Sequence, residues 1–221
     1  MILCIDTALE KCSIALCWNG ECIDVLTNDQ TYKASEVLHI LIEQLLAKNN
    51  IGMEDLKAVA VNGGPGSYTG LRIGATAAKG LCYALDIPLI NINGLRLMTE
   101  EILERFDSTF DYYIPMIDAR RMEVFTCIFD REMNTILPPQ PKILTSDFLD
   151  AYENYRIVIY GNGGEKAKEI LNKKQISFVS NVETSAKYFK TLVWNKWLNK
   201  NFENNNTYAP KYLKKFHSIS H

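Results

Sequence analysis

Short apolar runs at the start of the chain predict three β-strands. Residues 2–6, 12–18 and 21–27 are mainly apolar, and Asn19-Gly20, between the last two runs, is a strong hairpin signal. Farther along, apolar residues recur at helical spacing in some segments and form short unbroken runs in others. These patterns predict helices at 35–48, 68–85 and 95–106 and strands at 57–62 and 89–92. This order of elements is typical of a mixed sheet covered by helices.

A similar order of elements begins again near residue 112. Strands are predicted at 112–118 and 122–130, joined by Ala119-Arg120-Arg121, and a third at 134–137 precedes the proline-rich stretch 138–141. The remaining patterns predict helices at 145–152, 165–174 and 184–200, strands at 156–160 and 176–180, and a turn at 161–164. We therefore expect two lobes of related fold, residues 1–106 and a smaller lobe at 111–221.

The most distinctive local feature is a glycine-rich turn before the helix at 68–85. Gly63, Gly64 and Gly66 permit positive φ and close approach of the backbone, and Pro65 fixes one φ angle. Ser67 or Thr69 can cap the following helix. Backbone N–H groups in such a turn can bind phosphate, but the lysine of a Walker A loop is missing. A phosphate-binding turn and a purely structural turn are both compatible with these residues.

The helices at 35–48 and 68–85 carry more apolar surface than a single buried stripe requires. Small residues along the second helix allow a neighbouring backbone to come close. If the two helices lie side by side, their outward faces form an apolar strip that another protein can cover. The predicted partner surface comprises Leu38, Leu41, Leu45, Leu71, Arg72, Ala75, Ala78, Lys79 and Cys82. The alternative is that the helices cover each other and their own lobe completely.

Charge is nearly balanced over the 221 residues but unevenly distributed. Residues 1–186 contain 17 basic and 25 acidic side chains, whereas 187–221 contain seven lysines and a single acidic residue, Glu203. Aromatic residues lie among these lysines, so the segment suits either an RNA contact or a solvated helix face.

The sequence contains neither a secretory leader nor an apolar run of about 18 residues, which is the length a membrane span needs. The six cysteines lie mostly in strand-like segments without C-x-x-C pairs. We therefore expect reduced core thiols, no zinc site, and a cytoplasmic protein that does not contact a membrane.

Three motifs in the same order and at matching spacing resemble the bacterial TsaB (YeaZ) family. They are Leu3-Cys4-Ile5-Asp6-Thr7-Ala8, Gly64-Pro65-Gly66-Ser67-Tyr68-Thr69-Gly70-Leu71-Arg72-Ile73-Gly74 and Ile117-Asp118-Ala119-Arg120-Arg121-Met122-Glu123-Val124-Phe125. The resemblance covers residues 1 to about 130 and is weaker beyond them.

This resemblance implies a two-lobed α/β fold of the actin-like and Hsp70-like ATPases, with ribonuclease H-like topology and mixed sheets flanked by helices. It implies a role in forming threonylcarbamoyladenosine (t6A) at tRNA position 37. The implied partners are a TsaD-type catalytic subunit, a TsaE-type ATPase through the complex, and a second copy of the chain when it is alone. The tRNA would be contacted only indirectly, and the chain would not be an enzyme on its own.

The residues themselves favour a degenerate nucleotide site. Such a transferase holds its metal ion with an H-x-x-x-H pair, which the first lobe lacks; His217 and His221 have this spacing only at the C-terminus. The segment after Asp6 lacks the glycine that lets amides close on a phosphate. We expect no metal, no catalytic residue and at most weak binding of ATP or ADP.

The residues predicted to form this degenerate site are Asp6, Thr7, Gly64, Gly66, Ser67, Asp118 and Gly163. Asp118 with Arg120 and Arg121 also fits a hairpin corner with an internal ion pair. The leading rival function is a stand-alone ATP-dependent kinase-like or acyl-transferring enzyme that uses Asp6 and the glycine turns. A purely homodimeric scaffold is a further alternative.

Overall fold

A computed structural model describes residues 1–28, 34–106, 109–171 and 173–214. The chain forms two compact units. Unit 1 contains Met1–Leu97 and Thr184–Lys211, and unit 2 contains Met98–Glu183 and the chain from Tyr212 onward. No helix of the described part is both long and apolar enough to cross a membrane.

Unit 1 is built on a five-stranded mixed sheet in the order β3-β2-β1-β4-β5. β1 is antiparallel to β2 and parallel to β4. The strands are β1 (Ile2–Asp6), β2 (Cys12–Trp18), β3 (Glu21–Asn28), β4 (Ala58–Asn62) and β5 (Leu89–Ile92). The helices are α1 (Ala34–Lys48), α2 (Tyr68–Leu85), α3 (Gly94–Phe106), which continues into unit 2, and α5 (Lys190–Leu198), with short 3₁₀ turns η1 (Met53–Asp55) and η3 (Ala186–Phe189).

Unit 2 contains a second five-stranded mixed sheet, in the order β10-β9-β6-β7-β8. Its strands are β6 (Tyr112–Asp118), β7 (Glu123–Asp130), β8 (Thr135–Ile143), β9 (Ile157–Tyr160) and β10 (Ile176–Val179). Helix α4 (Gly164–Ile170) and the 3₁₀ turn η2 (Asp150–Tyr152) complete the unit. Read from β8, this sheet repeats the strand order of unit 1: an antiparallel meander, then two strands parallel to the first. The predicted duplication and ribonuclease H-like topology are therefore confirmed.

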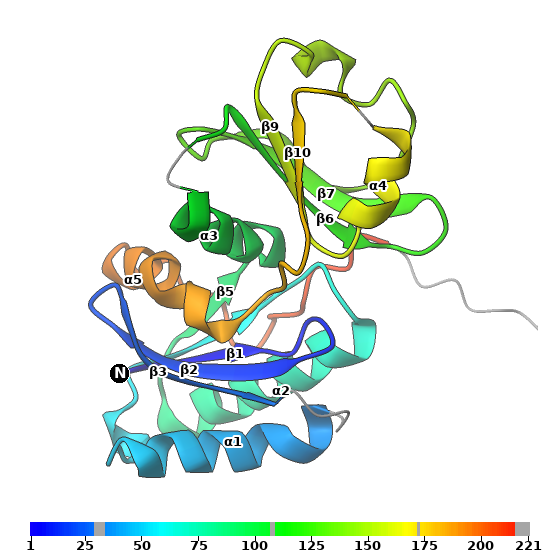
Figure 1. The fold of residues 1–221 in the computed structure, drawn as a ribbon. Coiled ribbons are helices and arrows are strands. Elements are labelled where there is room, and N and C mark those ends of the chain that lie inside the picture. The colour runs from blue at the N-terminus through cyan, green and yellow to red at the C-terminus, as the bar shows by residue number, and fades with distance from the viewer. Residues whose placement is uncertain (29–33, 107–108, 172, 215–221) are drawn as a thin grey trace, which may run out of the picture. The chain divides into compact units, whose positions relative to one another are not determined.

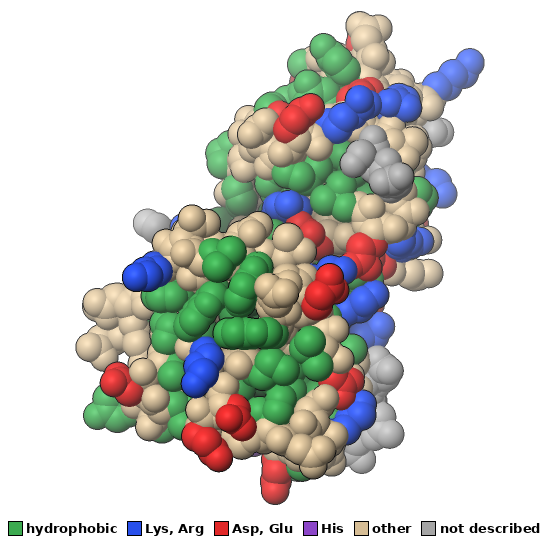
Figure 2. Space-filling model, turned by 90° about the vertical axis from the view of Figure 1, so that its left-hand side faces the viewer, with side chains coloured by type: hydrophobic (Ala, Val, Ile, Leu, Met, Phe, Trp, Pro, Cys, Tyr) green, Lys and Arg blue, Asp and Glu red, His purple; other side chains and the backbone are tan. Residues whose placement is uncertain are grey.

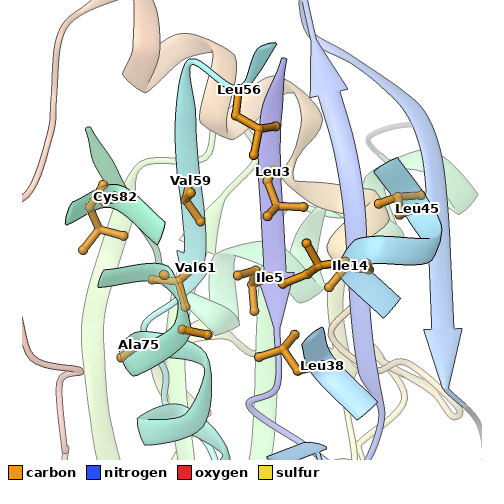
Figure 3. Close-up of a cluster of buried hydrophobic side chains, with 14 of the residues drawn as sticks. Leu3, Ile5, Ile14, Leu38, Leu45, Leu56, Val59, Val61, Ala75 and Cys82 are labelled. Carbon is orange, nitrogen blue, oxygen red and sulfur yellow. The ribbon is translucent and has the colours of Figure 1, made fainter. Parts of the chain in front are cut away.

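The central strands of unit 1 are apolar on both faces because both faces are covered. Leu3 and Ile5 of β1 point into a cluster with side chains of α1 and α2, such as Leu38 and Ala75 (Figure 3). The alternate residues of the same strand pack on the opposite face against η3 and α5. Figure 1 shows the sheet between these two helical layers. The unbroken apolar runs in the sequence thus reflect a strand buried on two sides.

The C-terminal segment belongs to unit 1, which differs from the predicted division at 107–111. Phe189 and Val193 are fully buried beside Ile2, Cys4 and Ala15 of the first two strands. The predicted single helix at 184–200 is divided into η3 and α5, and Ser185 caps its start by accepting a hydrogen bond from the Lys187 amide. Burial of these apolar side chains on the free face of the sheet accounts for the return of the chain.

Aromatic rings extend this packing from the core to the surface of unit 1. The ring centre of Trp18, at the end of β2, lies 5.0 Å from that of Trp194 and 6.3 Å from that of Trp197. Trp197 in turn lies 5.7 Å from Phe202. Figure 2 shows apolar side chains gathered on the surface of unit 1. The aromatic residues predicted either to meet RNA or to lie on a solvated helix face therefore include several that fasten α5 to its own sheet.

Three predicted elements of unit 2 differ from the observed ones. Strand β8 includes Pro138, Pro139 and Pro141, which an edge strand tolerates because its outer N–H groups have no partner strand. The segment predicted as a helix at 145–152 forms turns with bonds to the third residue back, such as Phe148 N–H to Thr145. Helix α4 ends at Ile170, earlier than predicted, where Leu171 turns into the core.

The packing of the returning segment gives a stability prediction. Phe189→Ala should lower the free energy of unfolding by about 3–5 kcal/mol, because it leaves a cavity between η3 and the sheet. Leu198→Ala, a matched control at the exposed end of α5, should change it by less than about 0.5 kcal/mol. Urea denaturation measures both values, and equal midpoints for the two variants would contradict this packing.

Candidate partner groove and phosphate turns

A groove with a volume of about 500 Å³ lies between α1 and α2 of unit 1. Its lining is mainly apolar and comprises Ser35, Leu38, His39, Arg72, Ile73, Thr76, Ala77, Gly80 and Leu81. Two large apolar side chains of the same helices, Ile40 and Tyr83, are 53% and 80% exposed. The two helices lie side by side, which is the condition on which the predicted partner surface depended, and together they form an apolar concave surface.

The predicted partner surface includes residues that lie on the wrong side of α2. Leu71, Ala75, Ala78 and Cys82 are at most 5% exposed and pack into unit 1. Small side chains on α2 bring this helix close to its own sheet rather than to another protein. In α1, Leu38 and Leu45 are likewise buried, although Leu38 also lines the groove.

The remaining predicted positions divide between groove and rim. Arg72 is exposed and lines the groove, with its guanidinium 4.2 Å from the ring centre of Tyr68. Leu41 is half-buried. Lys79 donates hydrogen bonds to the carbonyls of Asn206 and Tyr208, so it fastens the C-terminal segment to α2.

Gly80 is one of seven groove-lining residues that sequence reasoning did not select. Among the residues that the structure describes, a Cβ atom added at this position would meet no atom within 4 Å. Glycine in an exposed helix interior costs about 1 kcal/mol relative to alanine, and no described neighbour is close enough to require it here. A mid-helix glycine on the side away from the sheet was therefore the available signal for a surface built for close approach.

The glycine turn packs directly on the segment that follows β1. The Ser67 N–H donates to the Ala8 carbonyl at 2.7 Å, and the Thr7 hydroxyl donates to the Gly70 carbonyl at 2.7 Å. A Cβ at Gly66 would overlap with the Ala8 carbonyl oxygen. Gly66 is needed because the two backbones touch at this point.

Several N–H groups of this turn are already satisfied within unit 1. Gly63 N–H donates to the Ile92 carbonyl and Gly64 N–H to the side-chain oxygen of Asn62. Gly70 N–H donates to the Ser67 hydroxyl, so Ser67 is the residue that caps α2. These contacts use donors that a phosphate cradle would need, and they support the structural interpretation of the turn.

Asp6 is buried at the end of β1, with an exposed fraction of 1%. Its Oδ1 accepts hydrogen bonds from the Ala8 N–H at 3.1 Å and from the Asn62 side-chain amide at 3.0 Å. Burial raises the pKa of Asp6 above its ordinary value, and these hydrogen bonds only partly oppose that effect. The hydrogen bond from Asn62 links the end of β1 to the end of β4.

Asp118 forms an ion pair, but its partner is Lys166 and not one of the neighbouring arginines. The Lys166 Nζ lies 2.5 Å from the Asp118 Oδ1. Partial burial would raise the pKa of Asp118, but the Lys166 ammonium and the Arg120 N–H together lower it. Gly163 lies in the same unit, where its N–H donates to the Met116 carbonyl and a Cβ would be 3.0 Å from Val124.

The described residues include no group of three or more His, Cys, Asp or Glu side chains that could hold a metal ion. His217 and His221, the pair with ligand spacing, lie outside the residues that the structure describes. The six cysteines are free thiols, five of them buried, and burial raises the pKa of Cys12 and of Cys82 to about 11.

Comparison with known proteins gives consistent relatives. A TsaB protein of Haemophilus influenzae, named for tRNA threonylcarbamoyladenosine biosynthesis, is 35% identical over 124 residues, which is 56% of this chain and 51% of that protein. The Escherichia coli TsaB protein is 32% identical over 135 residues, which is 61% of this chain and 57% of that protein. The chain thus matches little more than half the length of these two relatives.

A solved structure described as YeaZ from Pseudomonas aeruginosa has the same fold. It aligns with a TM-score of 0.78 over 96% of this chain and 99% of that one, at 21% sequence identity.

The family model described as TsaD, tRNA N6-adenosine threonylcarbamoyltransferase, matches residues 30–217. This match covers most of the chain, and the relatives named above carry the TsaB and YeaZ names. The chain therefore belongs to the TsaD family of proteins and, within it, to the TsaB (YeaZ) group.

Proposed function

We propose that the chain is a non-catalytic subunit that binds and organises a TsaD-type transferase during t6A modification of tRNA adenosine 37. The names of its relatives support the pathway, and its membership of the TsaD family supports a structurally related partner. In this proposal the assembled complex acts on tRNA, a TsaE-type ATPase joins through the complex, and the location is the cytoplasm.

The observation that carries this proposal is the groove between α1 and α2. Apolar groups line it, Ile40 and Tyr83 of the same two helices are exposed, and Gly80 leaves space for a partner backbone. Covering roughly 600 Å² on each partner gives an interface near the lower limit for stable, specific protein complexes. The gain from apolar burial there is on the order of 10 kcal/mol or more before the cost of association.

A second copy of the chain can present the same surface, so we infer that the isolated protein pairs with itself through the groove. A self-complementary helix face is the usual arrangement in a two-fold symmetric dimer. The transferase then competes with the second copy for one surface, and a heterodimer and a homodimer exclude each other.

The rival function, a stand-alone ATP-dependent enzyme, has less support. In the glycine turn before α2, the N–H groups of Gly63, Gly64 and Ser67 already donate to Ile92, Asn62 and Ala8. A catalytic aspartate is also more useful when it is charged and reachable than when it is buried with a raised pKa.

Gly80→Arg tests the groove directly. The arginine should project from an unobstructed position, leave the fold intact, and weaken association with the transferase at least about 100-fold, equivalent to about 2.7 kcal/mol. Isothermal titration with the TsaD-type subunit measures this loss. Gln44→Arg, at an exposed α1 position outside the groove lining, adds the same charge and should bind normally. Unchanged affinity of the Gly80 variant would remove the groove from the proposal.

Gly80→Ala separates stability from association. Alanine should raise the free energy of unfolding by up to about 1 kcal/mol, because it favours the helix and has room for its methyl group. If α2 is closely approached by the partner, the same methyl group should weaken binding although the protein is more stable. Thermal melting and titration of one sample measure the two effects, and a variant that is both more stable and equally tight-binding would argue against close helix packing.

Reconstitution of tRNA modification tests the non-catalytic role. With transferase and ATPase subunits present, omission of the chain should abolish or strongly reduce t6A formation, whereas the chain alone should neither modify tRNA nor turn over ATP. Calorimetry with ATP and Mg²⁺ on the isolated chain completes the test. Tight binding and turnover of ATP by the isolated chain would favour the stand-alone enzyme. Full t6A formation without the chain would favour a scaffold that has no part in this reaction.

A further inference from the structure

In the turn between β6 and β7, two arginines occupy positions whose backbone conformation is energetically more favourable for glycine or asparagine. Arg120 has φ of 70° and Arg121 has φ of 52°, so both adopt the left-handed region. Glycine and asparagine enter this region most readily, whereas a long side chain is disfavoured. Departures from local preference of this kind are expected mainly where a site serves function.

The turn is held in this conformation by polar contacts within unit 2. The Asp118 Oδ1 accepts from the Arg120 N–H at 2.6 Å, and the Asn162 side-chain oxygen accepts from the Asp118 N–H at 2.9 Å. The Lys166 ammonium donates to the Asp118 carboxylate, to the Arg121 carbonyl at 2.6 Å and to the Glu123 carbonyl at 3.2 Å. The backbone around the arginines is therefore fixed before any ligand arrives.

The acidic groups beside the turn form their ion pairs with lysines rather than with the arginines. Asp118 pairs with Lys166, and Glu123 pairs with Lys214, which also donates to the Ala119 carbonyl. In the part of the chain that the structure describes, neither Arg120 nor Arg121 forms a salt bridge, and both residues are exposed. The turn therefore presents two guanidinium groups on a rigid support, with net positive charge around them.

We propose that Arg120 and Arg121 form a binding site for the phosphate backbone of RNA. Guanidinium groups bind phosphate oxygens in a bidentate manner, and arginine suits this task better than lysine. The site rests on the proposed function, since tRNA is the substrate of that reaction, and it gives this chain its own contact with the tRNA inside the complex. A fixed pair of cations adds affinity without reading sequence, as phosphate contacts generally do.

Fluorescence titration of an unmodified tRNA transcript tests the site, with the assembled complex and with the full isolated chain. Arg120→Gln/Arg121→Gln should weaken tRNA binding about tenfold or more at low salt, and should reduce the slope of log K against log[salt] by about 1.5. Lys142→Gln/Lys174→Gln, which removes the same charge elsewhere in unit 2, should change affinity by less than about threefold.

The double variant Arg120→Asn/Arg121→Gly distinguishes phosphate binding by the arginines from a purely structural role. These residues suit the left-handed backbone, so the variant should melt at a higher temperature than the parent while losing tRNA affinity like the glutamine variant. A merely structural role for the arginines predicts a lower melting temperature or unchanged tRNA binding.

Three results would overturn the proposal. In the first, affinity and salt slope are unchanged in the glutamine variant. In the second, that variant fails to assemble with the transferase, and in the third, the parent chain binds polyglutamate as tightly as tRNA; either of these two outcomes would show that the arginines recognise protein carboxylates. Failure of the parent chain to pair with the transferase would refute the proposed function instead, and the isolated-chain titration would still decide the role of the arginines.

Discussion

The close approach of α2 to the start of the sheet is the contact on which the rest of unit 1 depends. Side chains are absent where the backbones meet: a Cβ at Gly70 would overlap with the Thr7 carbonyl oxygen, and one at Gly74 would overlap with the Thr7 hydroxyl. Alanines continue this contact along the helix as Ala75 and Ala78. The helix is therefore fixed in height and rotation against β1 and β4.

This single contact shapes both the glycine turn and the groove. It includes the hydrogen bond from the Ser67 N–H to the Ala8 carbonyl, which engages one donor of the turn within unit 1. It also directs Ile73, Thr76 and Gly80 away from the sheet, where with α1 they form the groove. The same packing thus supports both the structural interpretation of the turn and the proposed partner groove.

Most elements of the fold could be predicted from the sequence, because strands that are buried on both faces appear as unbroken apolar runs. The strands at 2–6, 12–18 and 89–92 and the helix at 68–85 were predicted with the observed bounds, since unbroken apolar runs and the Ser67 cap mark them. Local signals could not show that the C-terminal helix returns to unit 1, because this depends on the shape of the free sheet face beside Ile2 and Cys4. The prolines of β8 likewise misled because tolerance of proline depends on whether a strand is at an edge.

The candidate groove was predicted at the level of helices and not of side chains. Apolar periodicity identified α1 and α2, but both sides of α2 are small and apolar, so composition could not decide which side meets the sheet. The surroundings of the glycines show which side of α2 meets the sheet. Gly70 and Gly74 have no space for a side chain, whereas Gly80 has space for one. The ion pair of Asp118 with Lys166 also could not be predicted, because the two residues are 48 positions apart and only the folded chain brings them together.

Hydrogen exchange of the chain, alone and in complex with a TsaD-type transferase, tests the central claim most directly. The account predicts slower exchange on binding in peptides covering 34–48 and 68–85, with the largest change around Gly80 and little change in α5. A complex that forms with unaltered exchange in these two helices, and with protection confined to other parts of the chain, would contradict it.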